Sequence, residues 1–129
     1  MSKVRVSFDF DDTICGKGDH VPHVWQILFN HLHHGDEVII LTARHPEHDT
    51  EAWRIANNPE RIAVKEHLDA LGIDLEVVYT SHEPKGPHAA RLGVRMHYDN
   101  DPAEIDSCRE HGILAVPVGN EHAPADLPD

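Results

Sequence analysis

Four short polar clusters in this sequence carry carboxylates, a hydroxyl and an ammonium, and each follows an apolar run. They are Asp9-Phe10-Asp11-Asp12-Thr13, Thr42-Ala43-Arg44, Lys85 and Asp99-Asn100-Asp101. Any one cluster has a simple explanation, because Asp, Thr and Asn are common at helix N-caps and in turns. All four together, in this order, predict one shared site.

The chemistry that suits these residue types is phosphoryl transfer. Carboxylates packed together repel one another unless a hard cation lies among them, and Mg²⁺ prefers oxygen ligands while keeping some of its water. Asp9, the main-chain carbonyl of Asp11, and Asp99 are the candidate ligands. A carboxylate beside Mg²⁺ can attack phosphorus and form an aspartyl-phosphate.

The spacing of Asp9 and Asp11 predicts two different roles at one phosphate. Residues i and i+2 share a face of a strand, so both side chains reach the same group where the strand opens into a loop. Asp9 is then the candidate nucleophile, and Asp11 the acid that protonates the leaving oxygen and later accepts a proton from water. Thr42 and Lys85 would hold the phosphoryl oxygens.

The elements that must position these residues follow from the hydrophobic pattern. Five β-branched runs predict buried parallel strands at 4–8, 37–41, 75–80, 94–98 and 113–118. Helical patterns lie between them, at 21–34, in two pieces within 49–71, and at 85–92 and 103–111. This order predicts a three-layer, Rossmann-like α/β fold: an open parallel sheet of about five strands with helices on both faces. Ligands bind such sheets at the carboxyl ends of the strands, where the four clusters fall.

Length and composition predict one cytoplasmic domain. The 129 residues fit a single α/β domain over 1–119, and the Pro-, Ala- and Asp-rich segment 120–129 is expected to be a flexible tail. No apolar run approaches the ~18 residues of a membrane helix, and no signal peptide precedes the first strand. Two cysteines are too few for a disulfide scaffold. A formal charge of −12 argues against strong non-specific binding to nucleic acid or anionic lipid, although a nucleic-acid end stays open as a substrate.

The 13 histidines make the net charge strongly dependent on pH. Protonating all of them would change the formal charge from −12 to +1. We predict that electrophoretic mobility changes steeply between about pH 7.5 and pH 5.5, because histidine titrates in this range. Mobility measured against pH tests this, and a flat profile would contradict it.

Four motifs resemble those of the haloacid dehalogenase superfamily. The first reads Asp-x-Asp-x-Thr after an apolar run, over 6–13. The second is the apolar run 38–42 ending in Thr, the third is a lysine at 85, and the fourth is the acidic segment 96–101. The resemblance spans 4–118. The fourth motif departs slightly, because many members have two adjacent acids and here Asn100 follows Asp99. Either Asn100 or Asp101 is then the candidate for the role of the second acid.

The resemblance implies a Mg²⁺-dependent phosphatase, since members that dehalogenate lack the Mg²⁺ site and the second acid of the first motif. It implies that Asp9 is the nucleophile, that Asp11 is the general acid/base, and that Thr13 shapes the loop around the substrate. The implied metal ligands are Asp9, Asp11, Asp99 and Asp101.

The spacing of the motifs leaves no room for a cap domain. Asp9 and Thr42 are 33 positions apart, and Thr42 and Lys85 are 43 apart, and predicted elements fill both intervals. We therefore expect an open site, unless another copy of the chain covers it. Capless members that resemble this chain act on bulky substrates such as nucleic-acid ends and proteins, or form oligomers that close the site.

A second resemblance concerns the substrate. The Thr-Ala-Arg sequence at 42–44, the Thr-x-x-Trp sequence at 50–53 and the segment 108–113 are similar to the phosphatase module of polynucleotide kinase-phosphatases. By this resemblance Arg44 would clamp the substrate phosphate in a bidentate contact. The alternative makes Arg44 a surface salt-bridge residue and Trp53 a core anchor. His45 and His48 either contact substrate or are polar loop residues.

Two other functions remain open. A receiver-type signalling module also combines a parallel sheet with an acidic Mg²⁺ pocket, a Thr and a Lys. In receivers the phosphorylated Asp ends the third strand and the Lys follows the fifth, whereas the runs 75–80 and 113–118 lack these residues. The other alternative is a module that binds Mg²⁺ or a partner without catalysis.

Overall fold

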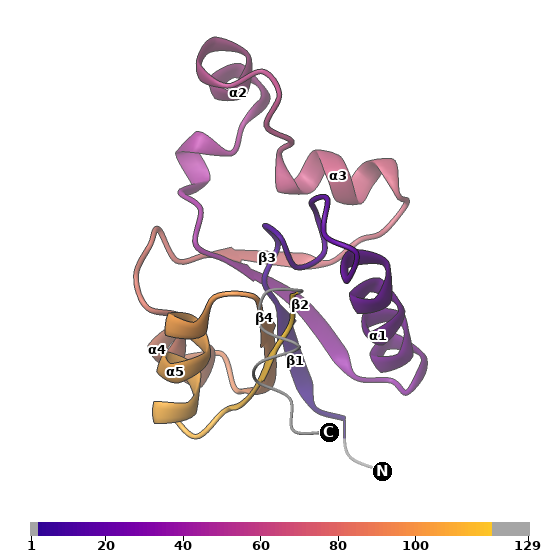
Figure 1. The fold of residues 1–129 in the computed structure, drawn as a ribbon, viewed down its shortest axis with the longest axis vertical. Helices are drawn as coiled ribbons and strands as arrows, with labels where there is room; N and C mark the ends of the chain where they lie inside the picture. The colour runs from indigo at the N-terminus through magenta and orange to yellow at the C-terminus, as the bar shows by residue number, and fades with distance from the viewer. Residues whose placement is uncertain (1–2, 120–129) are drawn as a thin grey trace.

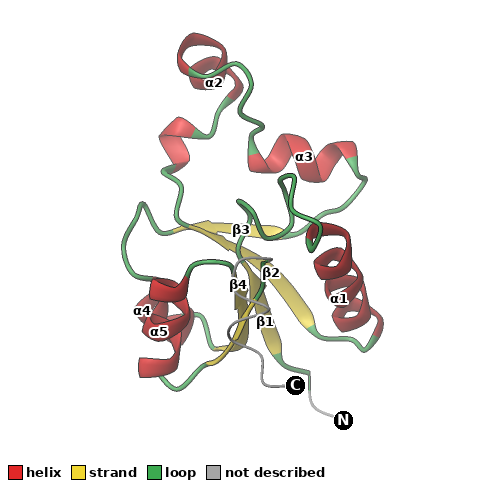
Figure 2. Cartoon of the chain, viewed as in Figure 1, coloured by secondary structure: helices red, strands yellow, loops and turns green. Residues whose placement is uncertain are grey.

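The computed structural model describes residues 3–119 and confirms the α/β fold (Figures 1 and 2). The segment 120–129, expected to be a tail, lies outside the described residues. The strands are β1 (Arg5–Phe8), β2 (Glu37–Thr42), β3 (Glu76–Tyr79), β4 (Val94–Asp99) and β5 (Leu114–Pro117). The helices are α1 (Val21–His33), α2 (Glu51–Asn57), α3 (Val64–Ala70), α4 (Lys85–Arg91) and α5 (Pro102–Glu110), with a short 3₁₀ helix η1 (Pro46–His48) that the sequence pattern did not predict.

The five strands form one parallel sheet in the order β3-β2-β1-β4-β5. The central strand is therefore the first in the sequence. From β1 the chain builds outward through β2 and β3 on one side, and then returns to build β4 and β5 on the other. Such a reversal creates a crevice at the carboxyl end of the central strand. Receiver domains have the order 2-1-3-4-5, which differs from the order seen here.

Two apolar clusters fill the spaces between the sheet and its helices. On one face, α1 and α3 pack against the sheet through Val24, Leu28, Val64 and Leu68. On the other face, α4 and α5 pack through Ala89, Ile105 and Cys108. These positions repeat at helical spacing in the sequence, so each helix buries one apolar stripe. Figure 1 shows the helices on the two sides of the sheet, as predicted.

The segment between β2 and β3 projects beyond the body of the fold. Helix α2 has no buried residue, and Figure 1 shows it standing away from the sheet. The predicted division of 49–71 into two helices is present, because α2 ends at Asn57 and α3 begins at Val64. Arg54 connects α2 to the rest of this segment, because it donates to the Pro59 carbonyl and pairs with Glu66 on α3.

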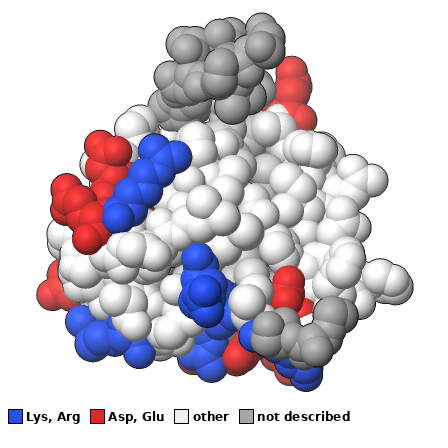
Figure 3. All heavy atoms as spheres, turned by 90° about the horizontal axis from the view of Figure 1, so that it is seen from below, with Lys and Arg blue, Asp and Glu red and all other residues white. Residues whose placement is uncertain are grey.

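The two ends of the sheet differ in charge. Figure 3 views the molecule from the end at which the strands begin, and most of that surface carries neither Lys and Arg nor Asp and Glu. The acidic residues singled out in the sequence lie at the opposite end, where the strands finish.

Among residues 3–119, no helix is long and apolar enough to cross a membrane.

Candidate active site

A pocket of about 570 Å³ opens at the carboxyl end of β1, at the reversal point of the sheet. Its lining includes one cation, Lys85, and one histidine, His82. Its acidic lining residues are Asp9, Asp11, Asp12, Asp99, Asp101 and Glu104. Carboxylates therefore outnumber cations in the pocket, as the sequence predicted for this edge of the sheet.

The floor of the pocket is a buried bridge of two carboxylates and one ammonium. Lys85 Nζ lies 2.7 Å from Asp9 Oδ1 and 2.7 Å from Asp99 Oδ2. Asp9 is 6% exposed, Lys85 is 1% exposed and Asp99 is 0% exposed. They come from the ends of β1 and β4 and from the first turn of α4. The sheet thus joins groups that are 76 positions apart in the sequence.

The two carboxyl groups of the bridge are in different electrostatic states. Burial raises the pKa of Asp9 to about 7, with Lys85 opposing this and Asp99 adding to it. Burial alone would also raise the pKa of Asp99, but the hydrogen bond from His97 and the charge of Lys85 hold it at about 2. Burial would lower the pKa of Lys85, but the two carboxylates raise it above its usual range. Perturbed groups of this kind cluster at functional sites.

The loop after β1 holds Asp9 in place. The Asp9 amide donates to the Tyr98 carbonyl at 2.9 Å, which continues the β1–β4 pairing by one residue. The loop then turns back, with the Phe10 carbonyl accepting from the amides of residues 13–15 and with Asp12 in the left-handed region at φ 60°. This turn brings the buried Thr13 hydroxyl within 3.0 Å of Asp9 Oδ2. Both oxygens of Asp9 therefore have a defined donor.

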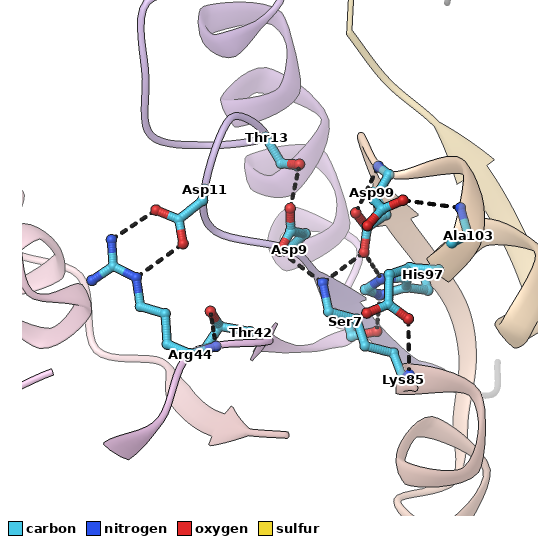
Figure 4. A network of polar contacts seen from close by, with 12 residues as sticks. Ser7, Asp9, Asp11, Thr13, Thr42, Arg44, Lys85, His97, Asp99 and Ala103 are labelled. Carbon is cyan, nitrogen blue, oxygen red and sulfur yellow. Dashed lines mark hydrogen bonds and ion pairs between the residues drawn. The ribbon is translucent and has the colours of Figure 1, made fainter. Parts of the chain in front are cut away.

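The Asp11 carboxylate points away from the bridge and toward Arg44, as Figure 4 shows. Arg44 Nε and Nη2 lie 2.9 Å and 2.7 Å from the two Asp11 oxygens, in a bidentate pair. Arg44 Nη1 also donates to Asp49 and to the Ile62 carbonyl. The guanidinium lies 5.0 Å from the centre of the Phe10 ring. Asp11 nevertheless lines the pocket, and its side chain is half exposed.

Three other predicted site residues have structural partners. Arg44 is 5% exposed and is therefore neither a surface residue nor a free phosphate clamp in this conformation. Thr42 is fully buried at the end of β2 and accepts from the Arg44 amide at 3.3 Å, while the next residue, Ala43, lines the pocket. The Asp101 side chain caps the start of α5 by accepting from the Ala103 amide. The Asp101 amide itself donates to Asp99 Oδ1 at 3.0 Å.

The sequence analysis missed a buried polar chain beneath the bridge. His97 Nε2 lies 2.7 Å from Asp99 Oδ2, and His97 Nδ1 lies 2.7 Å from Ser7 Oγ. Burial lowers the pKa of His97, so its ring is neutral at pH 7. His97 then donates to Asp99 through Nε2 and accepts from Ser7. His97 therefore takes no part in the change of net charge predicted for the histidines between pH 7.5 and pH 5.5. Its i, i+2 spacing from Asp99, which places both residues on one face of the strand, was the signal in the sequence for this contact.

The second set of missed residues surrounds Arg44. Asp49 accepts from Arg44, from the Val64 amide and from the Tyr79 hydroxyl, which lies 2.6 Å from it. This network joins the ends of β2 and β3 to the start of α3, and so fixes Arg44 beside Asp11. Its members are far apart in the sequence, and no motif marked Asp49 or Tyr79 in advance.

Removing the His97 side chain should destabilise the fold. We expect His97→Leu to lower the free energy of unfolding by about 1–3 kcal/mol, because it leaves a buried Ser7 hydroxyl and one Asp99 oxygen with fewer partners. Replacing Ser7 as well, in a Ser7→Ala/His97→Leu variant, should recover part of the loss, because one orphaned group is then gone. Urea unfolding of both variants measures this, and an equal or larger loss in the double variant would contradict it.

The donor set of the pocket suits Mg²⁺ in kind. Within residues 3–119, no three His, Cys, Asp or Glu side chains come together as a complete metal site. Mg²⁺ is commonly held by one or two carboxylates, with water and substrate phosphate completing its shell. Asp9 and Asp99 offer two such carboxylates in a pocket whose acidic lining residues outnumber its basic ones.

No protein-family model matches this chain, and no curated protein is significantly similar to it in sequence. What the structure defines is therefore a class of fold and site: an open, Rossmann-like parallel sheet with an acidic pocket at the end of its first and central strand.

Proposed function

We propose that this protein is a Mg²⁺-dependent phosphomonoester hydrolase that works through an aspartyl-phosphate on Asp9, as in the haloacid dehalogenase superfamily that its motifs resemble. The observation that carries the proposal is the buried Asp9–Lys85–Asp99 bridge at the floor of the pocket. A carboxylate, an ammonium and a second carboxylate, all fixed in position, are the groups needed for attack on phosphorus and for charge stabilisation.

In the first step, an Asp9 oxygen attacks the phosphorus of the substrate. The bond from phosphorus to the leaving oxygen breaks, and Asp11 gives its proton to that oxygen. Asp11 is paired with Arg44 in the structure, so it must first leave that pair, take up a proton from solvent and turn into the pocket. Lys85 contributes positive charge to the phosphoryl oxygens, as does Mg²⁺ when it is bound by Asp9 and Asp99.

In the second step, water attacks the phosphorus of the aspartyl-phosphate. Asp11, now ionised, accepts the proton of that water, and the bond from phosphorus to Asp9 breaks to release inorganic phosphate. Thr13 keeps the Asp9 carboxylate oriented, and Asp99 holds Lys85 in place between the steps. Thr42, at the end of β2, steadies the backbone of Arg44 and with it the position of Asp11.

Phosphomonoesters are the proposed substrate class, with nucleotides and phosphorylated polynucleotide ends as the candidates. The pocket volume of about 570 Å³ falls within the range for small-molecule sites. Hydrolysis of p-nitrophenyl phosphate in Mg²⁺ and in EDTA tests the proposal. Turnover that requires Mg²⁺ is the expected result. Mg²⁺ binding without turnover of any phosphomonoester would instead favour the non-catalytic alternative.

The role of Asp11 can be tested with a series of leaving groups. We expect Asp11→Asn to slow the hydrolysis of alkyl phosphates by about 10²–10⁴-fold, the usual range for a general acid. Aryl phosphates such as p-nitrophenyl phosphate should be slowed less, because their leaving oxygen needs less protonation. Values of kcat/KM across the series measure this, and equal losses for all leaving groups would contradict the role.

A further inference from the structure

Four aromatic rings form a continuous row that begins at the rim of the pocket. The rings of His82 and His45 meet edge to face, with centroids 4.9 Å apart and an interplanar angle of 63°. The rings of His45 and His48 are tilted by 57°, with centroids 5.1 Å apart. The row ends at Trp53, whose ring stacks on His48 at 4.7 Å with an interplanar angle of 22°. His82 lines the same pocket as Asp9 and Lys85.

The backbone brings these rings together from segments that are far apart in the sequence. His45 directly precedes η1, and His48 is its last residue. Trp53 lies on the projecting α2, whereas His82 lies in the loop between β3 and α4. Beyond the ends of β2 and β3, the amides of residues 80–82 donate to the carbonyls of Thr42, Arg44 and Ala43. These bonds hold the His82 loop against the start of η1, so the row is a built feature and not a chance contact between mobile loops.

The row is too exposed to be a core cluster. His82 is exposed and the other three residues are half-buried. His82 is also held in the left-handed region at φ 66°, directly after Ser81 at φ 53°. Two consecutive residues other than glycine in this region are uncommon, and such strain is concentrated at functional sites. Within residues 3–119 the histidines do not form a group that could hold a metal ion, so contact with an aromatic ring is the chemistry that the row offers to a ligand.

We propose that the row, beginning at His82, stacks the nucleobase of a substrate whose phosphate occupies the pocket. This inference rests on the proposed function and names its substrate as a nucleotide, free or at the end of a strand. Bases stack on aromatic side chains without needing a particular sequence. Stacking also suits this protein because it requires no basic groove, and the chain carries a formal charge of −12.

The test compares substrates that differ in the base alone. Adenosine 5′-monophosphate and ribose 5-phosphate have the same leaving oxygen and differ in the base. Adenosine 3′-monophosphate tests a nucleotide whose phosphate is on the 3′ oxygen of the ribose. We expect higher kcat/KM for at least one nucleotide than for ribose 5-phosphate. His82→Asn removes the ring while tolerating the left-handed backbone. It should reduce kcat/KM for the nucleotide about tenfold and leave ribose 5-phosphate unchanged.

Matched variants separate stacking from structure. His82→Tyr keeps a ring and should retain most of the nucleotide preference. His33→Asn removes an exposed histidine at the far end of α1 and should change nothing. A short oligonucleotide with a terminal phosphate distinguishes the two sources of the base. If Trp53→Leu weakens turnover of the oligonucleotide alone, the row accepts neighbouring bases of a strand, and if it weakens neither substrate, the base is that of a free nucleotide.

Two results would overturn the proposal. One is a wild-type protein that turns over ribose 5-phosphate as well as either nucleotide, and the other is an equal effect of His82→Asn on substrates with and without a base. Failure of the hydrolase proposal has a different signature. In that case no phosphomonoester is turned over, but calorimetry still shows tighter binding of the nucleotide than of ribose 5-phosphate, and His82→Asn removes that difference.

Discussion

Replacing Asp9 by Asn is expected to reduce phosphomonoester turnover by at least about a thousandfold, as the loss of a covalent nucleophile does. The amide of Asn has nearly the same shape as the carboxyl group but cannot form the acyl-phosphate bond. The variant also retains the hydroxyl of Thr13 and the ammonium of Lys85 as neighbours. The expected loss is therefore one of chemistry, with KM changing little.

The fold should survive this substitution. Burial raises the pKa of Asp9 to about 7, which means that its ionised form is disfavoured in the folded chain. A neutral Asn removes that penalty, and Lys85 keeps Asp99 as its partner. Thermal unfolding should show a Tm at or above that of the wild type at pH 8 without metal. The control is Asp69→Asn, which removes an exposed carboxylate on α3 and should retain full activity. Wild-type turnover by Asp9→Asn would contradict the mechanism.

Replacing Lys85 by Met is expected to cause the largest loss of stability. The substitution keeps a long side chain but leaves Asp9 and Asp99 facing each other without the ammonium that lies 2.7 Å from both. Removing one partner of a buried ion pair typically costs about 3–5 kcal/mol, because the remaining charge is uncompensated. Activity should also be lost, since the same ammonium is proposed to stabilise the phosphoryl oxygens.

A second substitution separates the buried charges from simple loss of packing. In Asp9→Asn/Lys85→Met, one of the two uncompensated carboxylates is neutral, so the double variant should be more stable than Lys85→Met. Lys65→Met on α3, where the side chain is exposed, is the matched control and should change the free energy of unfolding little. Urea unfolding of all three variants measures this. A loss in Lys85→Met no larger than in Lys65→Met would contradict the role of the bridge.

Much of the fold could be predicted from the sequence, because buried parallel strands appear as continuous apolar runs. Each run matches an observed strand to within two residues, and the polar residues that follow β1 and β4 lie in one pocket. The motifs carried this information because Asp9 directly follows β1, Asp99 ends β4, and Lys85 begins the helix that follows β3. The sequence alone therefore predicts that Asp9, Lys85 and Asp99 lie in one site.

The partners of Arg44 and His97 could not be predicted in the same way. Arg44 has the type and position of a phosphate clamp, but its direction depends on Asp49 and Tyr79, which meet through tertiary packing. His97 is a polar residue within a buried strand and so is an exception to the apolar pattern, but it is one of the partners that hold Asp99. The ring row has the same origin, since His82 reaches His45 through loop hydrogen bonds that leave no mark on hydrophobic periodicity.

The measurement that tests the central claim most directly is to trap the covalent intermediate. The protein is mixed with Mg²⁺ and substrate, quenched during turnover, and reduced with borohydride, which converts an aspartyl-phosphate to homoserine. Mass spectrometry of the peptides then locates the reduced residue. We predict homoserine at position 9, and none when substrate is omitted. Reduction at another carboxylate, or Mg²⁺-dependent turnover with no reduced residue, would contradict attack by Asp9.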